Sequence, residues 1–172
     1  MSGTQERRVV LVRHAKAVPK DGVDDFDRPL ADRGRADATA TGRRLAGSRL
    51  GVALARCSSA RRTRQTWQLM LPSLADRPPT VYDDRLYNAG AEELLAAVTA
   101  TDDGVSGLLL VGHNPGIQEL ATALAAEGLP DLLRRIAAGL PTCAVAVVDF
   151  HGSWTDLAPG TGRLTALWAP GD

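Results

Sequence analysis

The sequence has few cysteines, no excess of basic residues and no long apolar run. Only two of its 172 residues are cysteines, Cys57 and Cys143, which are too few for a disulfide framework and fit a reducing compartment. Lysine and arginine total 20, as do aspartate and glutamate, so the chain lacks the basic excess of a generic nucleic-acid or anionic-membrane binder. No run approaches the roughly 20 apolar residues of a membrane span. These absences predict a cytoplasmic protein with no nucleic-acid or membrane partner.

The ends and the middle of the chain carry no sign of a second unit. The beginning, MSGTQERRVVLV, has no apolar segment long enough for a secretory signal. No repeat, low-complexity tract or linker interrupts the sequence, and its 44% hydrophobic and 23% charged residues are ordinary for a globular protein. We therefore expect residues 1–172 to form one domain, a length that allows an ample core.

Short aliphatic or β-branched runs alternate with longer segments rich in alanine, leucine and arginine. The runs predict strands at Val9–Val12, Gly51–Ala55, Thr80–Tyr82, Gly107–Val111, Ala144–Phe150 and Leu164–Trp168. The longer segments predict helices near Asp32–Ser48, Ala60–Leu74, Ala91–Ala100, Pro115–Ala126 and Asp131–Ala138. Continuous apolar strands separated by helices indicate a sheet covered on both faces. The predicted fold is α/β, a three-layer α/β/α sandwich whose mostly parallel sheet has an antiparallel edge formed by the C-terminal strands.

Polar residues follow three of these strands directly. Arg13 and His14 come after the first, the segment CSSARRTRQT (57–66) after the second, and GHNPG (112–116) after the fourth. Ligands of open α/β sheets bind beyond the carboxyl ends of the strands. Two of the three histidines in the chain therefore fall where a ligand is expected, together with several arginines.

The residues around these histidines and arginines favour a phosphate site. Asn114 and Pro115 are typical of a helix start, which would place His113 beside the positive end of a helix dipole. Ser58 and Ser59 are candidate caps for the arginine-bearing helix. On that helix Arg61 and Arg64 share a face, readily explained as a solvated basic face, and Arg62 projects elsewhere. Guanidinium groups match phosphate oxygens, and a neutral imidazole is a competent nucleophile toward phosphorus.

The motifs resemble those of the histidine phosphatase superfamily, which includes phosphoglycerate mutases, and in particular its short SixA-type phosphohistidine phosphatases. The resemblance is carried by six blocks in the family's order, VRHA (12–15), DxxRPLxxxG (25–34), SSARRTRQT (58–66), RLYNA (85–89), VGHNPG (111–116) and LPT (140–142). It implies that His14 is the nucleophile and forms a phosphohistidine intermediate. It also implies that Arg13, Arg62 and His113 bind the phosphoryl group with His14, Arg62 being chosen over Arg61 by its spacing to Gln65 and Thr66.

The chain departs from the family pattern at two places. Ala15 stands where the family usually has glycine, and Tyr87 and Asn88 follow Leu86 where mutase-like members carry a glutamate acid. Asp25, which matches a SixA-type aspartate, is the first candidate for the general acid, and Asp84 is the second. Because an imidazole leaving group needs less protonation than an alkoxide, the missing glutamate favours phosphohistidine as the substrate.

The sequence therefore predicts a metal-independent phosphatase without a cofactor, acting on a phosphohistidine-bearing protein or a phosphorylated small molecule. No metal-ligand cluster such as HxxxH or CxxC is present. A non-catalytic phosphate or phosphopeptide-binding module, and a small-molecule phosphatase or mutase of the same fold, remain the alternatives. A tyrosine-phosphatase site is excluded because Thr63 and Asp149, not arginine, stand six residues after the two cysteines. His151 and the tryptophans Trp154 and Trp168 are expected to be structural.

Overall fold

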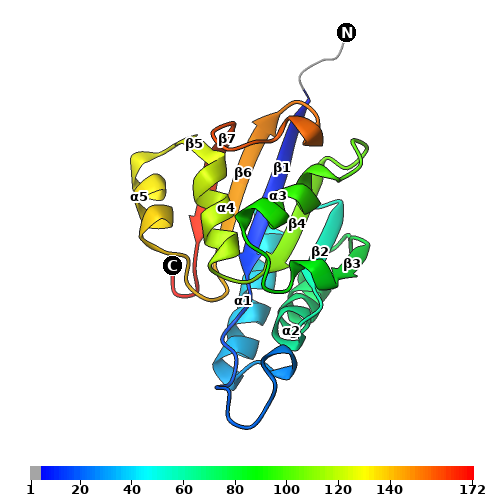
Figure 1. Cartoon of the computed structure of the whole chain (residues 1–172), viewed down its shortest axis with the longest axis vertical. Coiled ribbons are helices and arrows are strands. Elements are labelled where there is room, and N and C mark those ends of the chain that lie inside the picture. The colour runs from blue at the N-terminus through cyan, green and yellow to red at the C-terminus, as the bar shows by residue number, and fades with distance from the viewer. Residues whose placement is uncertain (1–4) are drawn as a thin grey trace.

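A computed structural model describes residues 5–172. The first four residues of the initial segment MSGTQERRVVLV, in which the sequence predicts no secretory signal, lie outside the described residues. In the described residues, seven strands form one sheet flanked by five α-helices, with four short 3-10 turns (Figure 1). The strands are β1 (Glu6–Arg13), β2 (Leu54–Ser58), β3 (Thr80–Asp83), β4 (Gly107–Gly112), β5 (Ala125–Gly128), β6 (Val145–His151) and β7 (Gly162–Trp168). The helices are α1 (Asp32–Ser48), α2 (Arg61–Met70), α3 (Ala91–Thr99), α4 (Gly116–Leu124) and α5 (Pro130–Ala138). The 3-10 turns are η1 (Asp25–Asp27), η2 (Leu71–Ser73), η3 (Asp84–Leu86) and η4 (Trp154–Asp156).

The sheet is mostly parallel, with the strand order β3-β2-β4-β1-β6-β7-β5. β1 pairs in parallel with β4, which is joined in parallel to β2 and then β3. The antiparallel pairs are β1 with β6 and β6 with β7, while β5 pairs in parallel with β7. The predicted α/β fold and the antiparallel C-terminal strands are confirmed. β5, however, forms that edge of the sheet, although the sequence assigned its first residues to a helix.

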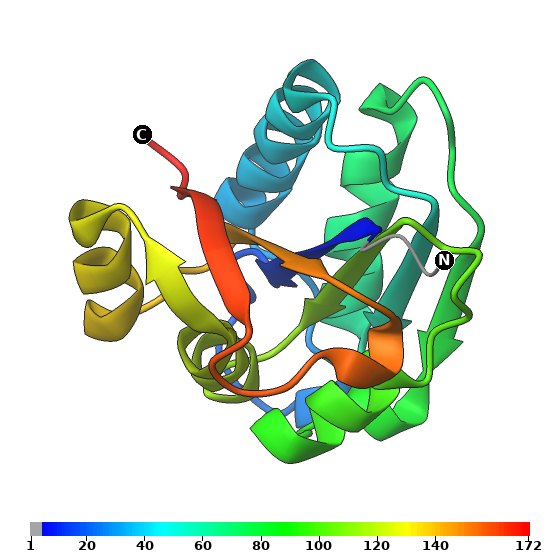
Figure 2. The same ribbon diagram turned by 90° about the horizontal axis from the view of Figure 1, so that it is seen from above.

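Helices cover both faces of the sheet (Figure 2), and an apolar core lies on each face. Val9 and Leu11 of β1 belong to the core under α3 and α4, whereas Val10 and Val12 pack with residues of α1 and α2. Successive side chains of a strand point to opposite faces, so a strand buried on both faces must be apolar at every position. The four valines and leucines of β1 are fully buried for this reason.

Some predicted boundaries were wrong. The second strand lies at Leu54–Ser58 rather than Gly51–Ala55, because hydrogen-bonded pairing with β3 and β4 begins only after the turn at Gly51, where φ is +69°. The helix predicted to run to Ala126 ends at Leu124, where the chain enters β5. The helix predicted over Ala60–Leu74 ends at Met70 and continues as the 3-10 turn η2.

Two motif glycines allow close approach of backbone segments around the sheet's carboxyl edge. A Cβ atom at Gly34, in the first turn of α1, would overlap the carbonyl oxygen of Lys16. A Cβ atom at Gly116, which opens α4, would overlap the carbonyl oxygen of Ala89. These contacts bring the loops that follow β1 and β3 against the helices that begin beside them.

Candidate active site

A pocket of about 270 Å³ opens at the carboxyl edge of β1 and β4, where the sequence predicts a phosphate site. Its lining includes four basic side chains and two imidazoles but no carboxylate. The lining residues are Arg13, His14, Lys16, Ala17, Arg28, Arg62, Asn88, His113, Asn114 and Thr142. The structure therefore brings together all four residues predicted to bind phosphate. Such a pocket favours an anion.

The imidazole of His14 is held in one tautomer. Its Nδ1 lies 2.7 Å from the carbonyl oxygen of Ala15. A carbonyl oxygen can only accept, so Nδ1 carries the proton and donates it, and Nε2 keeps its lone pair. Burial, together with the charges of Arg62 and Arg13, lowers the pKa of His14 to about 4 against the weaker opposing effect of the Ala15 bond. At neutral pH, His14 therefore presents an unprotonated Nε2.

His113 lies beside His14, with the two ring centroids 5.4 Å apart. Its Nε2 lies 2.7 Å from Oγ of Ser58, whereas its Nδ1 has no hydrogen-bond partner in the described part of the chain. Burial, the neighbouring His14 and the charge of Arg62 lower the pKa of His113 to about 3. Both imidazoles are therefore neutral at pH 7.

The guanidinium groups of Arg13 and Arg62 are held differently. Arg13 donates from Nη1 to the carbonyl oxygen of Leu140 at 2.9 Å, and burial lowers its pKa. Arg62 is 4% exposed and donates to Asp25, from Nη1 to the backbone oxygen at 2.6 Å and from Nη2 to Oδ2 at 3.0 Å. The Nε atoms of both arginines are buried without a partner among residues 5–172. Both side chains thus retain N–H donors that the protein does not use.

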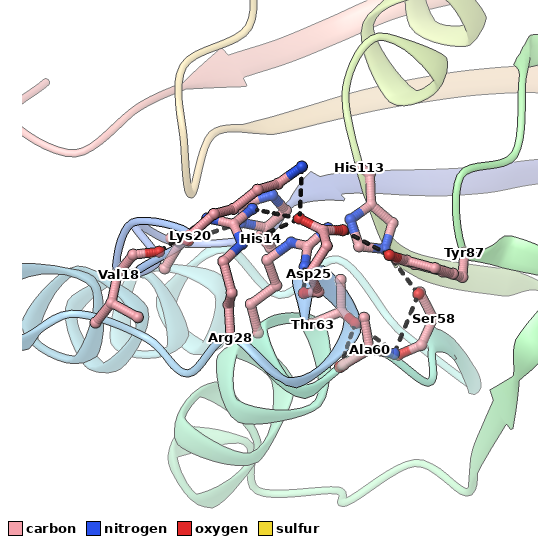
Figure 3. Close-up of polar contacts among 12 residues, drawn as sticks. His14, Val18, Lys20, Asp25, Arg28, Ser58, Ala60, Thr63, Tyr87 and His113 are labelled. Carbon is pink, nitrogen blue, oxygen red and sulfur yellow. Dashed lines mark hydrogen bonds and ion pairs between the residues drawn. The ribbon is translucent and has the colours of Figure 1, made fainter. Parts of the chain in front are cut away.

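Asp25 is the centre of a polar cluster on the loop between β1 and α1 (Figure 3). Its carboxylate accepts from Arg62, from Arg28 at 2.9 Å and from the hydroxyl of Tyr87 at 2.5 Å, and it lies 3.6 Å from Nζ of Lys20. The Tyr87 hydrogen bond and the charge of Arg62 hold the pKa of this carboxyl far below its usual range. Asp25 is therefore ionised at neutral pH. Asp84, the second candidate acid, is exposed, accepts a hydrogen bond from Ser59 and is absent from the pocket lining.

The helix starts near the site differ from those predicted. The prediction that Asn114 caps α4, with Pro115 as its first residue, was wrong: α4 begins at Gly116 with Pro115 at its cap, and Asn114 Nδ2 instead donates to Leu140 at 2.9 Å. The capping prediction for Ser58 and Ser59 was also wrong, because α2 starts after Ala60 without a side-chain cap. The two serine hydroxyls are engaged by His113 and Asp84 instead.

The other residues singled out in the sequence take structural or surface positions. Arg61 is exposed, Arg64 is half-buried and Arg62 is buried, so Arg62 projects apart from the other two as predicted. His151 is exposed at the end of β6, whereas Trp154 and Trp168 are buried in the cores. Ala15 is fully buried, and its N–H donates to Thr66 Oγ1 at 3.0 Å.

Several side chains of the site were not predicted as site residues or were left undecided. Tyr87 and Ser58 contact Asp25 and His113, and the pocket lining also includes Lys16, Arg28, Asn88 and Thr142. The block RLYNA contained the only sequence signal for Tyr87 and Asn88. Within residues 5–172, no group of three or more His, Cys, Asp or Glu side chains could hold a metal ion. None of the helices described is long and apolar enough to cross a membrane.

Comparison with known proteins gives consistent matches along the chain. The model of the histidine phosphatase superfamily (branch 1) matches residues 9–95. An uncharacterized protein of Mycobacterium tuberculosis is 36% identical over 161 residues, which cover 92% of this chain and 99% of the relative. A solved structure from Nakamurella multipartitia, assigned as a phosphohistidine phosphatase SixA, is 33% identical with a TM-score of 0.81 and covers 97% of this chain and 98% of its own. A second, from Agrobacterium tumefaciens with the same assignment, is 34% identical with a TM-score of 0.81 and covers 95% and 98%.

Proposed function

The chain belongs to the histidine phosphatase superfamily, and from that premise we propose that it is a phosphatase acting through a phosphohistidine intermediate on His14. The observation that carries this proposal is the hydrogen bond from His14 Nδ1 to the carbonyl oxygen of Ala15. It leaves an unprotonated Nε2 in a pocket lined by four cations. A neutral imidazole beside fixed positive charges is the arrangement that nucleophilic attack on a phosphoryl group requires.

In the first step, the lone pair of His14 Nε2 attacks phosphorus, and the bond from phosphorus to the leaving group breaks. The leaving group departs with that electron pair and takes a proton from solvent or from an acid. Arg13, Arg62 and His113 surround the phosphoryl oxygens and stabilise their charge through N–H donors that have no partner within residues 5–172. In the second step, the oxygen of water attacks phosphorus and the bond from phosphorus to His14 Nε2 breaks. The electron pair of that bond returns to Nε2, a proton of the water passes to solvent, and inorganic phosphate and the neutral imidazole result.

Asp25 holds Arg62 rather than supplying the proton. A carboxyl whose pKa lies far below its usual range carries almost no proton at neutral pH, which is unfavourable for a general acid. Its backbone and side-chain oxygens together accept two hydrogen bonds from Arg62, which fixes the plane of that guanidinium at the pocket wall. Asp84 is separated from the pocket lining and has no evident route to a leaving group.

The substrate is a phosphohistidine in a protein, with small phosphomonoesters as weaker substrates. An imidazole leaving group needs less protonation than an alkoxide, so this pocket without a protonated carboxyl suits phosphohistidine best. The assignments of the two relatives from Nakamurella multipartitia and Agrobacterium tumefaciens point in the same direction. Hydrolysis is favoured over mutase activity because Tyr87, not a glutamate, follows Leu86.

Ala15 gives no support to a non-catalytic binding module. Its methyl group is buried with Leu30, Ala38 and Cys143, and its N–H bonds to Thr66, so the residue fits its position without disturbing His14. Its carbonyl oxygen is the acceptor that fixes the His14 tautomer, a role that alanine performs as well as glycine.

The test compares His14→Ala with His151→Ala, whose histidine is exposed at the far end of β6. We expect His14→Ala to abolish turnover of p-nitrophenyl phosphate and of a phosphohistidine protein, and to abolish acid-labile labelling of the chain by a radioactive phosphoryl donor. His151→Ala should retain both. Turnover by His14→Ala, or phosphate binding by the wild type with no turnover of any phosphohistidine, sugar or aryl phosphate, would contradict the proposal.

A further inference from the structure

We propose that Ser58 is a positioning residue that fixes the proton of His113 on Nδ1, the atom that faces no protein partner. This inference rests on the proposed function, in which His113 donates to the phosphoryl group. Ser58 is fully buried and His113 is 6% exposed, and their Oγ and Nε2 atoms lie 2.7 Å apart. The sequence suggests only a helix cap for this serine.

The surroundings of the Ser58 hydroxyl decide which group donates. The backbone N–H of Ala60 donates to Ser58 Oγ at 3.4 Å, so that oxygen already acts as an acceptor. For the hydroxyl proton, the acceptor found among residues 5–172 is His113 Nε2. If Nε2–H donated instead, the buried serine hydroxyl proton would have no acceptor among residues 5–172, at a cost of about 1–3 kcal/mol, whereas His113 Nδ1 lacks a protein partner in either tautomer. The serine therefore donates, and the neutral His113 carries its proton on Nδ1.

Ser58 is held firmly enough to perform this role. It is the last residue of β2, and the pairing of Cys57 with Val111 aligns the end of β2 with the end of β4, from which His113 extends. Its backbone oxygen accepts from Thr63 Oγ1 at 2.6 Å, which ties the end of the strand to the first turn of α2. The figure shows Ser58, Thr63 and Ala60 grouped below the His113 ring (Figure 3).

The position of this proton decides whether His113 attracts or repels the substrate. With the proton on Nδ1, the ring offers a donor to an anionic phosphoryl oxygen. With the proton on Nε2, the same ring would offer a lone pair, which repels that oxygen. A partner on the far nitrogen of an imidazole commonly fixes its tautomer, and its loss typically costs about 10–100-fold in metal sites, which we take as the scale here.

The experiment measures the tautomer and the turnover together in Ser58→Ala, with Ser59→Ala as the matched control. Ser59 is the neighbouring serine, but its hydroxyl bonds to exposed Asp84 rather than to the site. Nitrogen-15 NMR of the full chain, with His113 assigned by the loss of its signals in His113→Gln, should show Nδ1 protonated in the wild type and in Ser59→Ala. In Ser58→Ala the signal should shift toward a mixture of tautomers, and kcat/KM should fall about 10–100-fold.

Several outcomes separate this inference from the proposed function. Wild-type His113 protonated on Nε2 would overturn the inference, even if Ser58→Ala failed to fold. A Ser58→Ala variant that matched Ser59→Ala in both tautomer and turnover would also overturn it. If the wild type showed the expected tautomer but hydrolysed no phosphorylated substrate, the proposed function would fail while the assignment of the proton stood.

Discussion

Strand β1 carries arginines at both of its ends, and the protein treats them in opposite ways. At the amino end, Arg8 donates from Nε and Nη2 to the two carboxylate oxygens of Asp149, at 2.6 and 2.9 Å. At the carboxyl end, Arg13 meets one carbonyl oxygen and no carboxylate, and its Nε has no partner in the described chain. A cation with a carboxylate of its own contributes to folding, whereas a half-buried cation without one is available to an anionic ligand. From this difference we expect the amino end of the strand to contribute to stability and the carboxyl end to bind an anionic ligand.

Among the variants that test this comparison, Arg13→Met should have the largest effect, because it removes the cation at the carboxyl end and keeps much of the side-chain length. Since the guanidinium stabilises charge on the phosphoryl group, kcat/KM should fall on the order of 10²–10³-fold. The free energy of unfolding should stay unchanged or rise, because no ion pair offsets the desolvation cost of burying this cation. The same desolvation lowers the pKa of Arg13. Aryl phosphate kinetics and urea denaturation of the same preparation measure the two effects.

The mirror variant, Arg8→Met, should behave in the opposite way. It leaves the Asp149 carboxylate, whose side chain is 12% exposed, without its guanidinium partner, so the free energy of unfolding should fall by about 1–3 kcal/mol. Its kcat/KM should match the wild type, because Asp149 and Arg8 lie at the end of β1 away from the pocket. If both variants lost activity and stability together, the two ends of β1 would not differ as argued.

The polar groups at the carboxyl edge of the sheet could be predicted from the sequence. One apolar strand ends in Arg13 and His14, and a second ends before His113, so these side chains meet at one sheet edge. Helix α1 also begins and ends as predicted, at Asp32 and Ser48. The hydrogen-bond partners of these side chains could not be predicted from the sequence. Ser58 and His113 are 55 residues apart and meet only because β2 lies beside β4, an order that hydrophobic periodicity does not specify. The same holds for Tyr87 and Asp25, whose contact joins two loops.

The short strand β5 was missed for a related reason. Its residues AAEG continue the composition of α4, and local propensity favours helix there. The pairing of Ala125 and Gly128 with β7 overrides that preference, and β7 stands more than 30 residues later in the chain. Local sequence therefore predicted residues that line one pocket, and tertiary contacts decided how each is held.

A smaller effect is expected from Asp25→Asn, which tests whether the cluster at the carboxyl end positions Arg62 or delivers a proton. Loss of the carboxylate charge weakens its bonds to Arg62 and Arg28, so kcat/KM should fall about 10-fold, or about 1.4 kcal/mol. The loss should be equal for p-nitrophenyl phosphate and phenyl phosphate, because a positioning residue acts on the phosphoryl group and not on the leaving group. A loss that grows as the leaving group becomes more basic would identify Asp25 as the acid instead.

Asp84→Asn, on an exposed carboxylate outside the pocket lining, is the matched control and should show no change in kcat/KM for either ester.

The last test is a dependence of stability on pH that should originate at the carboxyl end alone. The pKa values of His14 and His113 in the folded protein are about 4 and about 3, below the usual value of 6.5. The unfolded chain therefore takes up protons first as the pH falls, and the stability present above pH 6.5 is lost progressively toward pH 4. Each histidine should contribute about 2 kcal/mol to the loss between pH 7 and pH 5, as measured by urea denaturation. The carboxylates with lowered pKa, such as Asp25, lose their contribution only below about pH 4, so they do not enter this window.

His14→Gln should reduce the loss of stability between pH 7 and pH 5, whereas Arg8→Met should leave that loss intact because it alters only the amino end. If His14→Gln lost as much unfolding free energy between pH 7 and pH 5 as the wild type, the His14 imidazole would not be desolvated as the pocket implies. The contrast between the two ends of β1 would then rest on the arginines alone.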